Sequence, residues 1–188
     1  GLHIFGSLTF IPGLRQEFKG DVYFEGGNSN NVIASAGKIF RKQVIMDGTG
    51  NWSLADSLST LLEFVFIQGN FNTNNQMLFS RSMLSQNPRN RTLTLGRSHW
   101  VLRRVDLQNY NTLIWEVNPQ SMVLDAGVST IEFRNWYGTL QTSFSGQGST
   151  LNYNQVWFLG GDGSMYTYYR NRQKADSIRC STSFYLYG

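Results

Sequence analysis

The stretch that decides the fold is Val44–Leu58, "VIMDGTGNWSLADSL". An apolar triplet leads into Asp-Gly-Thr-Gly, and "NWSLADSL" then alternates apolar and polar residues. Alternation of this kind is typical of a strand with one buried face, and a glycine-rich break between two such runs indicates a change of direction. The stretch is therefore either a corner between two strands or a catalytic or metal-binding loop.

The same phrase of strand, glycine-bearing break and strand returns along the chain. It returns in "FVFIQGNFNTNNQMLF" (Phe64–Phe79), "RTLTLGRSHWVL" (Arg91–Leu102) and "SMVLDAGVSTIEF" (Ser121–Phe133). Residues 7–28 and 130–163 form a longer, approximate repeat that ends in a Gly-Gly pair. Strands recurring with turn residues at nearly every gap predict an all-β chain. Repetition of one phrase favours a parallel β-helix, with a β-sandwich or jelly roll as the alternative.

Composition agrees with an all-β surface protein. The 188 residues are 14% aromatic and only 15% charged, with 19 glycines and 3 prolines. One domain over residues 1–188 is expected at this length. No stretch reaches the roughly 18 apolar residues of a membrane-spanning helix. The opening "GLHIFGSLTF" lacks the features of a secretion signal, so we expect the chain to be a fragment of a longer protein.

Catalytic chemistry has little support in the sequence. The chain has two histidines and one cysteine: His3, His99 and Cys180. They form no metal-binding or nucleophile–base spacing, and alternation makes His99 a residue on the face of a strand. The one loose carboxylate group, Glu17, Asp21 and Glu25, has no spacing that fixes a common face. We therefore predict no catalytic residues, with a polysaccharide lyase or hydrolase as a minor alternative whose acids come from adjacent rungs.

No cofactor or metal is predicted either. Calcium is conceivable at Asp47–Asn51 or at "GGDGS" (Gly160–Ser164), but each segment supplies one carboxylate and lacks the spacing of a calcium loop. The Gly-x-Gly patterns do not open helices, so they do not form phosphate loops. In the aligned phrases Asp47 corresponds to Leu95 and Asp125, which favours a plain corner over a reactive carboxylate.

Basic residues cluster in two regions, and aromatic residues accompany the second. The clusters are Arg89, Arg91, Arg97, Arg103 and Arg104, and then Arg170, Arg172, Lys174 and Arg179. The conservative interpretation is a solvated face whose arginine stems cover aromatic edges. Most tryptophans should stack in the core or on the surface of the rungs. Contact with a glycan or polyanion is the functional alternative, and nucleic acid is not expected. The candidate glycan-binding residues are Trp136, Tyr137, Tyr166, Tyr168, Arg170 and Arg172.

Four phrases resemble a pattern in large cell-surface proteins of Bacteroidetes. "DGTGNWSLADSL", "QGNFNTNNQMLFSRSM", "RTLTLGRSHWVL" and "LDAGVSTIEF" are similar, in that order, to G-T-G-x-W-x-L, G-x-F-x-T-N, R-T-L-x-L-G and L-x-A-G-x-S-T-I-x-F. The resemblance covers residues 7–133 and implies an extended right-handed parallel β-solenoid, exported by the type IX route and acting as an adhesin. It brings no catalytic motif. This chain has more arginine and aromatic residues than the usual pattern.

The sequence as a whole predicts a non-catalytic, secreted or cell-surface adhesin or scaffold that presents loops from a rigid solenoid. The resemblance implies an extracellular or outer-surface location in a bacterium. A jelly-roll carbohydrate-binding module and a polysaccharide-degrading β-helix enzyme are the alternatives. Expected partners are neighbouring solenoid rungs, other cell-surface proteins and a glycan, because an open rung presents unpaired strand edges.

Overall fold

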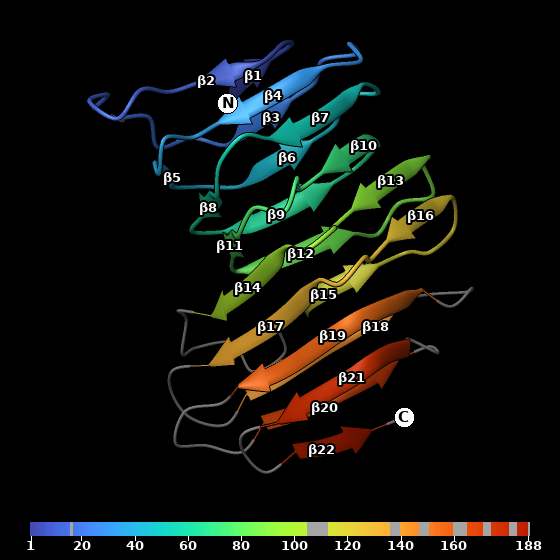
Figure 1. Cartoon of the computed structure of the whole chain (residues 1–188). Helices are drawn as coiled ribbons and strands as arrows, with labels where there is room; N and C mark the ends of the chain where they lie inside the picture. The colour runs from blue at the N-terminus through green and yellow to red at the C-terminus, as the bar shows by residue number, and fades with distance from the viewer. Residues whose placement is uncertain are drawn as a thin grey trace.

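The chain is an all-β solenoid (Figure 1). The computed structural model describes residues 1–15, 17–104, 113–135, 140–146, 151–159, 165–170, 174–180 and 184–187. Within these ranges the chain forms 22 strands and no helix, and every paired strand runs parallel to its partners. Sandwiches and jelly rolls pair their strands antiparallel. The predicted parallel β-helix is therefore confirmed.

The strands form three sheets. Sheet A contains β1 (Leu2–Ile4), β3 (Val22–Phe24), β6 (Val44–Met46), β9 (Glu63–Phe66), β12 (Ser82–Ser85), β15 (Leu113–Val117), β18 (Leu140–Gly146), β20 (Met165–Arg170) and β22 (Phe184–Tyr187). Sheet B contains β2 (Leu8–Thr9), β4 (Asn31–Ala34), β7 (Asn51–Leu54), β10 (Gly69–Asn72), β13 (Arg91–Thr94) and β16 (Met122–Asp125). Sheet C contains β5 (Ile39–Phe40), β8 (Leu58–Thr60), β11 (Leu78–Ser80), β14 (His99–Arg104), β17 (Thr130–Asn135), β19 (Asn152–Leu159) and β21 (Lys174–Cys180).

One turn of the solenoid passes through sheets A, B and C in that order. The next turn stacks on it in register, so that Val44 of β6 lies opposite Phe64 of β9 and Met46 lies opposite Phe66. Backbone hydrogen bonds between parallel strands of successive turns hold the rungs about 4.8 Å apart. Alternate residues of each short strand therefore point into the solenoid or out to solvent.

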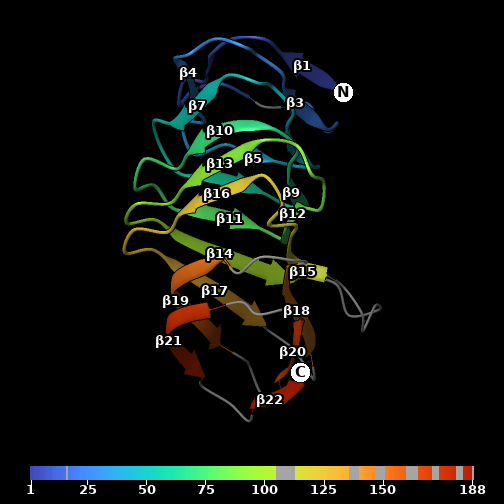
Figure 2. The same cartoon turned by 90° about the vertical axis from the view of Figure 1, so that its right-hand side faces the viewer.

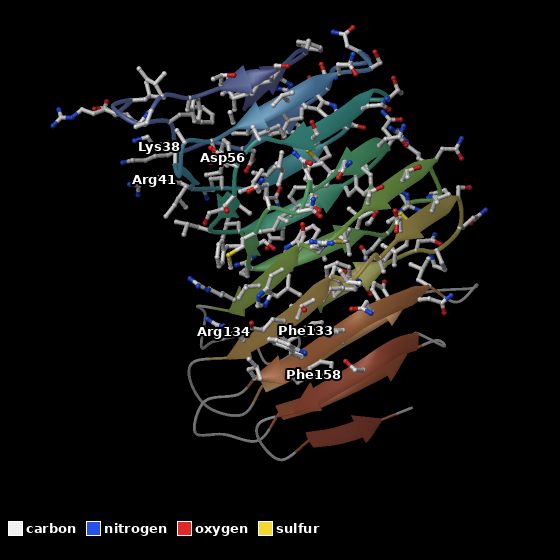
Figure 3. The ribbon with its side chains drawn as sticks, viewed as in Figure 1. Lys38, Arg41, Asp56, Phe133, Arg134 and Phe158 are labelled. Carbon is white, nitrogen blue, oxygen red and sulfur yellow. The ribbon has the colours of Figure 1, made fainter. Side chains whose placement is uncertain are left out.

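Aromatic side chains fill the interior. Trp100 lies 5.1 Å from Phe64 and 5.3 Å from Trp115, ring centroid to ring centroid, in edge-to-face contacts. Phe133 and Phe158, labelled in Figure 3, stack at 4.8 Å. Most tryptophans were expected either in the core or on the surface of the rungs, and three of them lie in the core, with low exposed fractions: Trp52 at 2%, Trp100 at 1% and Trp115 at 0%. Aromatic columns of this kind join the cores of successive rungs.

The recurring phrase describes two different corners. Between sheets A and B, a Cβ added at Gly69 (φ +86°) would lie 2.1 Å from the carbonyl oxygen of Gly48 in the previous turn. Between sheets B and C, the breaks in the phrases at 91–102 and 121–133 stack directly, and a Cβ at Gly127 (φ +53°) would lie 2.4 Å from the carbonyl oxygen of Gly96. Glycine is thus needed where backbones of adjacent rungs approach closely.

The structure corrects the alignment of Asp47 with Leu95 and Asp125. Asp47 follows β6 at the corner between sheets A and B, whereas Leu95 and Asp125 lie where sheet B leads into sheet C. Because Met46 pairs with Phe66, the residue equivalent to Asp47 in the next turn is Ile67. The phrases align in sequence because glycine occurs at both kinds of corner, although one kind joins sheets A and B and the other joins sheets B and C.

Sheet B is shorter than the other two sheets. Figure 2 shows β4, β7, β10, β13 and β16 stacked in one column, and β16 is its last strand. In the part of the chain that the structure describes, β18 of sheet A is followed by β19 of sheet C with no sheet B strand between them. Among the described strands, the turns that follow β17 therefore contain sheets A and C only, and Val123 in the last described strand of sheet B is 61% exposed.

Candidate functional site

The structure describes only part of the predicted glycan site. Trp136, Tyr137 and Arg172 lie outside the described residues. The backbone of β20 is described, and its register places Tyr166, Tyr168 and Arg170 opposite alternate residues of β18. That the six candidates form one glycan-binding site stays a prediction.

A groove lies along the corner between sheets A and B. It has a volume of about 860 Å³, is open to solvent and extends over four turns of the solenoid. Its lining residues are Thr49, Gln68, Gly69, Asn70, Pro88, Arg89, Asn90, Arg91, Thr92, Ser121, Met122 and Val123. We call this feature the corner groove.

Unequal corner lengths explain the corner groove. The connection from β9 to β10 consists only of Ile67 and Gln68, while the connections before and after it are residues 47–50 and 86–90. The longer connections stand out on either side of the short one. The floor consists of outward residues of sheet B in register, with Asn70 opposite Thr92 and Thr92 opposite Val123.

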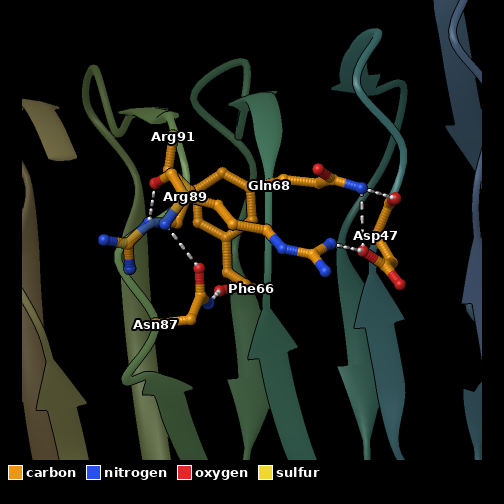
Figure 4. Close-up of polar contacts among 6 residues, drawn as sticks. All are labelled: Asp47, Phe66, Gln68, Asn87, Arg89 and Arg91. Carbon is orange, nitrogen blue, oxygen red and sulfur yellow. Dashed lines mark hydrogen bonds and ion pairs between the residues drawn. The ribbon is translucent and has the colours of Figure 1, made fainter. Parts of the chain in front are cut away.

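An ion pair spans the corner groove (Figure 4). Arg89 Nη1 lies 3.2 Å from Asp47 Oδ1 across the intervening turn. Gln68 Nε2 donates to the carbonyl oxygen of Asp47 at 2.7 Å and to its Oδ1 at 3.0 Å. The Arg89 side chain is still 56% exposed, so the pair contributes little to stability and leaves guanidinium donors facing solvent. Asp47 thus helps to orient the Arg89 side chain.

Arg91 has a structural role beneath the groove. Its side chain donates through Nε to Arg89 O (2.8 Å), through Nη1 to Ser85 O (2.7 Å) and Oγ (2.5 Å), and through Nη2 to the carbonyl oxygens of Asn118 and Gln120 (both 2.8 Å). These bonds use all five donors of the guanidinium. Arg91 is only 2% exposed, and burial lowers the pKa of its guanidinium.

The solvated role expected for the first basic cluster is therefore wrong for Arg91. This guanidinium joins the connection at 86–90 to the connection at 118–121 in the next turn. No donor remains for a ligand. Arg91 therefore stabilises the corner groove from beneath and has no free donor with which to contact a bound ligand.

The other sequence candidates occupy separate places. His99 begins β14 and pairs in register with Thr130, which confirms its place on a strand face. The loose carboxylate group does not form a site, because Asp21 accepts the backbone N–H of Gln43 (3.1 Å) while Glu25 lies 2.9 Å from His3 Nδ1. Among the described residues, no three His, Cys, Asp or Glu side chains are grouped as metal ligands would be.

The lining of the corner groove consists mainly of groups that form hydrogen bonds. Its lining residues supply amide and hydroxyl groups together with one exposed guanidinium, and they include no histidine, cysteine or carboxylate. A nucleophile paired with a base is therefore absent from the lining residues. Sequence reasoning missed Gln68, Asn70 and Thr92 as site residues. The sequence did contain a signal for the groove, namely a short connection at residues 67–68 between longer ones at 47–50 and 86–90. Only the structure shows that these three connections lie next to one another.

No family model, no curated protein and no solved structure matches this chain. Within the described ranges there is also no helix long and apolar enough to cross a membrane. The site must therefore be interpreted from its own geometry.

Proposed function

We propose that this chain is a non-catalytic binding and scaffold module of a secreted or cell-surface bacterial protein, and that its corner groove binds a neutral polysaccharide. The observation that carries the proposal is the groove itself, an open channel across four turns lined by amides, hydroxyls and one exposed guanidinium. The location and the adhesin role rest on the resemblance to Bacteroidetes surface proteins.

Sugar chains match this lining in chemistry and in spacing. Side-chain amides and hydroxyls both donate and accept hydrogen bonds, as sugar hydroxyls do. Asn70 and Thr92 occupy one register column, so donors and acceptors repeat along the floor about every 4.8 Å. Because stacked rungs hold the groove in place before a ligand arrives, little ordering is needed on binding.

Affinity electrophoresis in gels containing xylan, glucomannan or mixed-linkage β-glucan tests the proposal. Arg89→Ala removes the exposed guanidinium from the groove, and Arg97→Ala removes an exposed arginine from the corner between sheets B and C as a matched control. Loss of a hydrogen bond to a charged group predicts about tenfold weaker binding for Arg89→Ala. The control should bind as the wild type does. Equal retardation of both variants, or wild-type migration unchanged in every gel, would contradict the proposal.

Asn70→Ala supplies a second readout in the same gels. Asn70 is exposed on the groove floor, and its Nδ2 donates to Asn51 Oδ1 at 2.6 Å. We expect weaker retardation with an unchanged melting temperature. Release of reducing ends or unsaturated products from these polymers would instead support the enzyme alternative.

Association with neighbouring solenoid rungs is a second candidate, favoured by the N-terminal end of the rod. There β1, β2 and β5 are the outermost strands of their sheets, and Phe5 and Ile11 are 66% and 65% exposed. Unpaired strand edges beside apolar side chains favour stacking of a further rung. Sedimentation velocity should show concentration-dependent association that Phe5→Ser with Ile11→Ser abolishes. A monomer at all concentrations would count against it.

A further inference from the structure

A buried ion cluster lies on the outer face of sheet C. Glu132 is only 1% exposed, although its register partner is Val101 on the outward side of β14. His99 Nε2 lies 2.7 Å from Glu132 Oε2, and Arg134 Nε contacts the other carboxylate oxygen. Burying a carboxylate is costly unless cations or donors compensate it. Arg134 supplies a cation for that compensation, and His99 Nε2 lies beside the second carboxylate oxygen.

Arg103 adds a cation that this cluster does not neutralise. It pairs in register with Arg134 of the next turn, so two guanidinium side chains leave adjacent strands about 4.8 Å apart. Like charges directly opposite each other in a sheet are unfavourable. The Arg103 guanidinium carbon lies 4.8 Å from the ring centroid of Phe79, and its buried Nε has no hydrogen-bond partner in the structure. Among the described residues, no carboxylate forms an ion pair with Arg103.

A half-exposed indole completes the surface. Trp157 follows Glu132 in the same register column, and its ring lies 5.6 Å from the His99 ring in an edge contact. We define the sheet C patch by these residues: Phe79, His99, Arg103, Glu132, Arg134 and Trp157. With one carboxylate against two guanidinium groups, the sheet C patch carries a net positive charge beside aromatic side chains. Figure 3 shows Arg134 at the edge of the solenoid.

We propose that the sheet C patch is a second ligand site, which binds an acidic group of an anionic polysaccharide, with Arg103 contacting the anion. A carboxylate or sulfate beside Arg103 would offset the repulsion between the cations of two adjacent strands. The Phe79 ring beside Arg103 and the Trp157 ring beside His99 give the patch an apolar component, which suits the carbon-bound faces of a sugar ring. Single-stranded nucleic acid is the less favoured ligand, because it requires several successive stacking platforms and the patch offers one half-exposed indole.

This site is independent of the corner groove. The groove follows the corner between sheets A and B, and the sheet C patch lies on the outer face of the third sheet. The proposed ligands also differ in charge. If the corner groove binds no neutral polysaccharide, the proposal for the sheet C patch is unaffected. If the sheet C patch binds no anionic polysaccharide, the proposal for the corner groove is unaffected.

Biolayer interferometry with immobilised protein tests the proposal. The probes are polygalacturonate for carboxylate, dextran sulfate for sulfate, unmodified dextran as the neutral control and a single-stranded oligodeoxynucleotide. The variant Arg103→Gln removes the unmatched charge while leaving Glu132 with both partners. Arg97→Gln removes one equally charged but exposed arginine from another corner, which controls for net charge. Arg103→Lys keeps the charge without the planar guanidinium, and thermal melting checks that each variant is folded.

We expect wild-type protein to bind one or both acidic polymers and not dextran. Arg103→Gln should bind about tenfold more weakly or worse, as expected for a lost charge-assisted hydrogen bond, with Arg103→Lys intermediate. Arg97→Gln should bind as the wild type does. The proposal is overturned if both glutamine variants weaken binding equally, if neither acidic polymer binds, or if the oligodeoxynucleotide binds more tightly than both.

Discussion

Replacing Arg91 by methionine should destabilise the solenoid more than any other single loss of charge described above. Methionine keeps the length of the stem but removes five donors, so the carbonyl groups of Ser85, Arg89, Asn118 and Gln120 lose their partner. A buried acceptor left unpaired costs about 1–3 kcal/mol. Relief from burying the charge offsets part of the sum, which leaves a loss of about 3–5 kcal/mol, as is typical when a buried charged network is broken.

For a chain of this size, that loss lowers the melting temperature by roughly 6–20 °C. Thermal melting followed by far-ultraviolet circular dichroism measures it. Arg97→Met is the matched control, because it removes an exposed arginine and should change stability by no more than about 0.5 kcal/mol. Arg91→Lys should fall between the two, since an ammonium supplies three donors to the same carbonyls. If Arg91→Met and Arg97→Met have the same melting temperature, Arg91 does not have the structural role assigned to it.

Two further predictions concern the corners. Gly69→Ala places a Cβ 2.1 Å from the carbonyl oxygen of Gly48 and should lower the melting temperature clearly more than Gly37→Ala does. Gly37 is the control because it has a similar positive φ of +74° but open space around it. Equal decreases in melting temperature in calorimetry would show that the glycine is needed for its φ alone. Asp56→Ala removes the acceptor of the Ser35 and Ala36 N–H groups, at 2.8 and 2.6 Å, and should cost about 1–3 kcal/mol. Asp125→Ala, at an exposed aspartate, is its control in urea unfolding, and matching midpoints for the two variants would show that the Asp56 bonds contribute nothing.

The sequence predicted the class of fold because that information is local. Alternation in "NWSL" and "RTLT" marks strands with one buried face, and glycine marks each change of direction. A repeated phrase then favours stacking. The assignment of corners to sheets is not local, which is why Asp47 was matched to Leu95 and Asp125 although it stacks above Ile67.

The candidate sites depend on neighbours in the next turn, which a single sequence does not identify. The corner groove exists because residues 67–68 are flanked in space by residues 47–50 and 86–90. The burial of Glu132 depends on His99, 33 positions earlier in the chain. Alternation alone predicts an exposed glutamate on an outward position. Arg91 was expected at the surface for the same reason, since its carbonyl partners become visible only after folding.

The unequal corners also bear on how a surface of this fold can change. The connections at residues 47–50, 67–68 and 86–90 differ in length, yet the strands on either side of them keep their register. Insertions and deletions at the corner between sheets A and B therefore leave the buried positions of the rungs unchanged. The shape of the corner groove can vary in this way while the ladder beneath it stays the same.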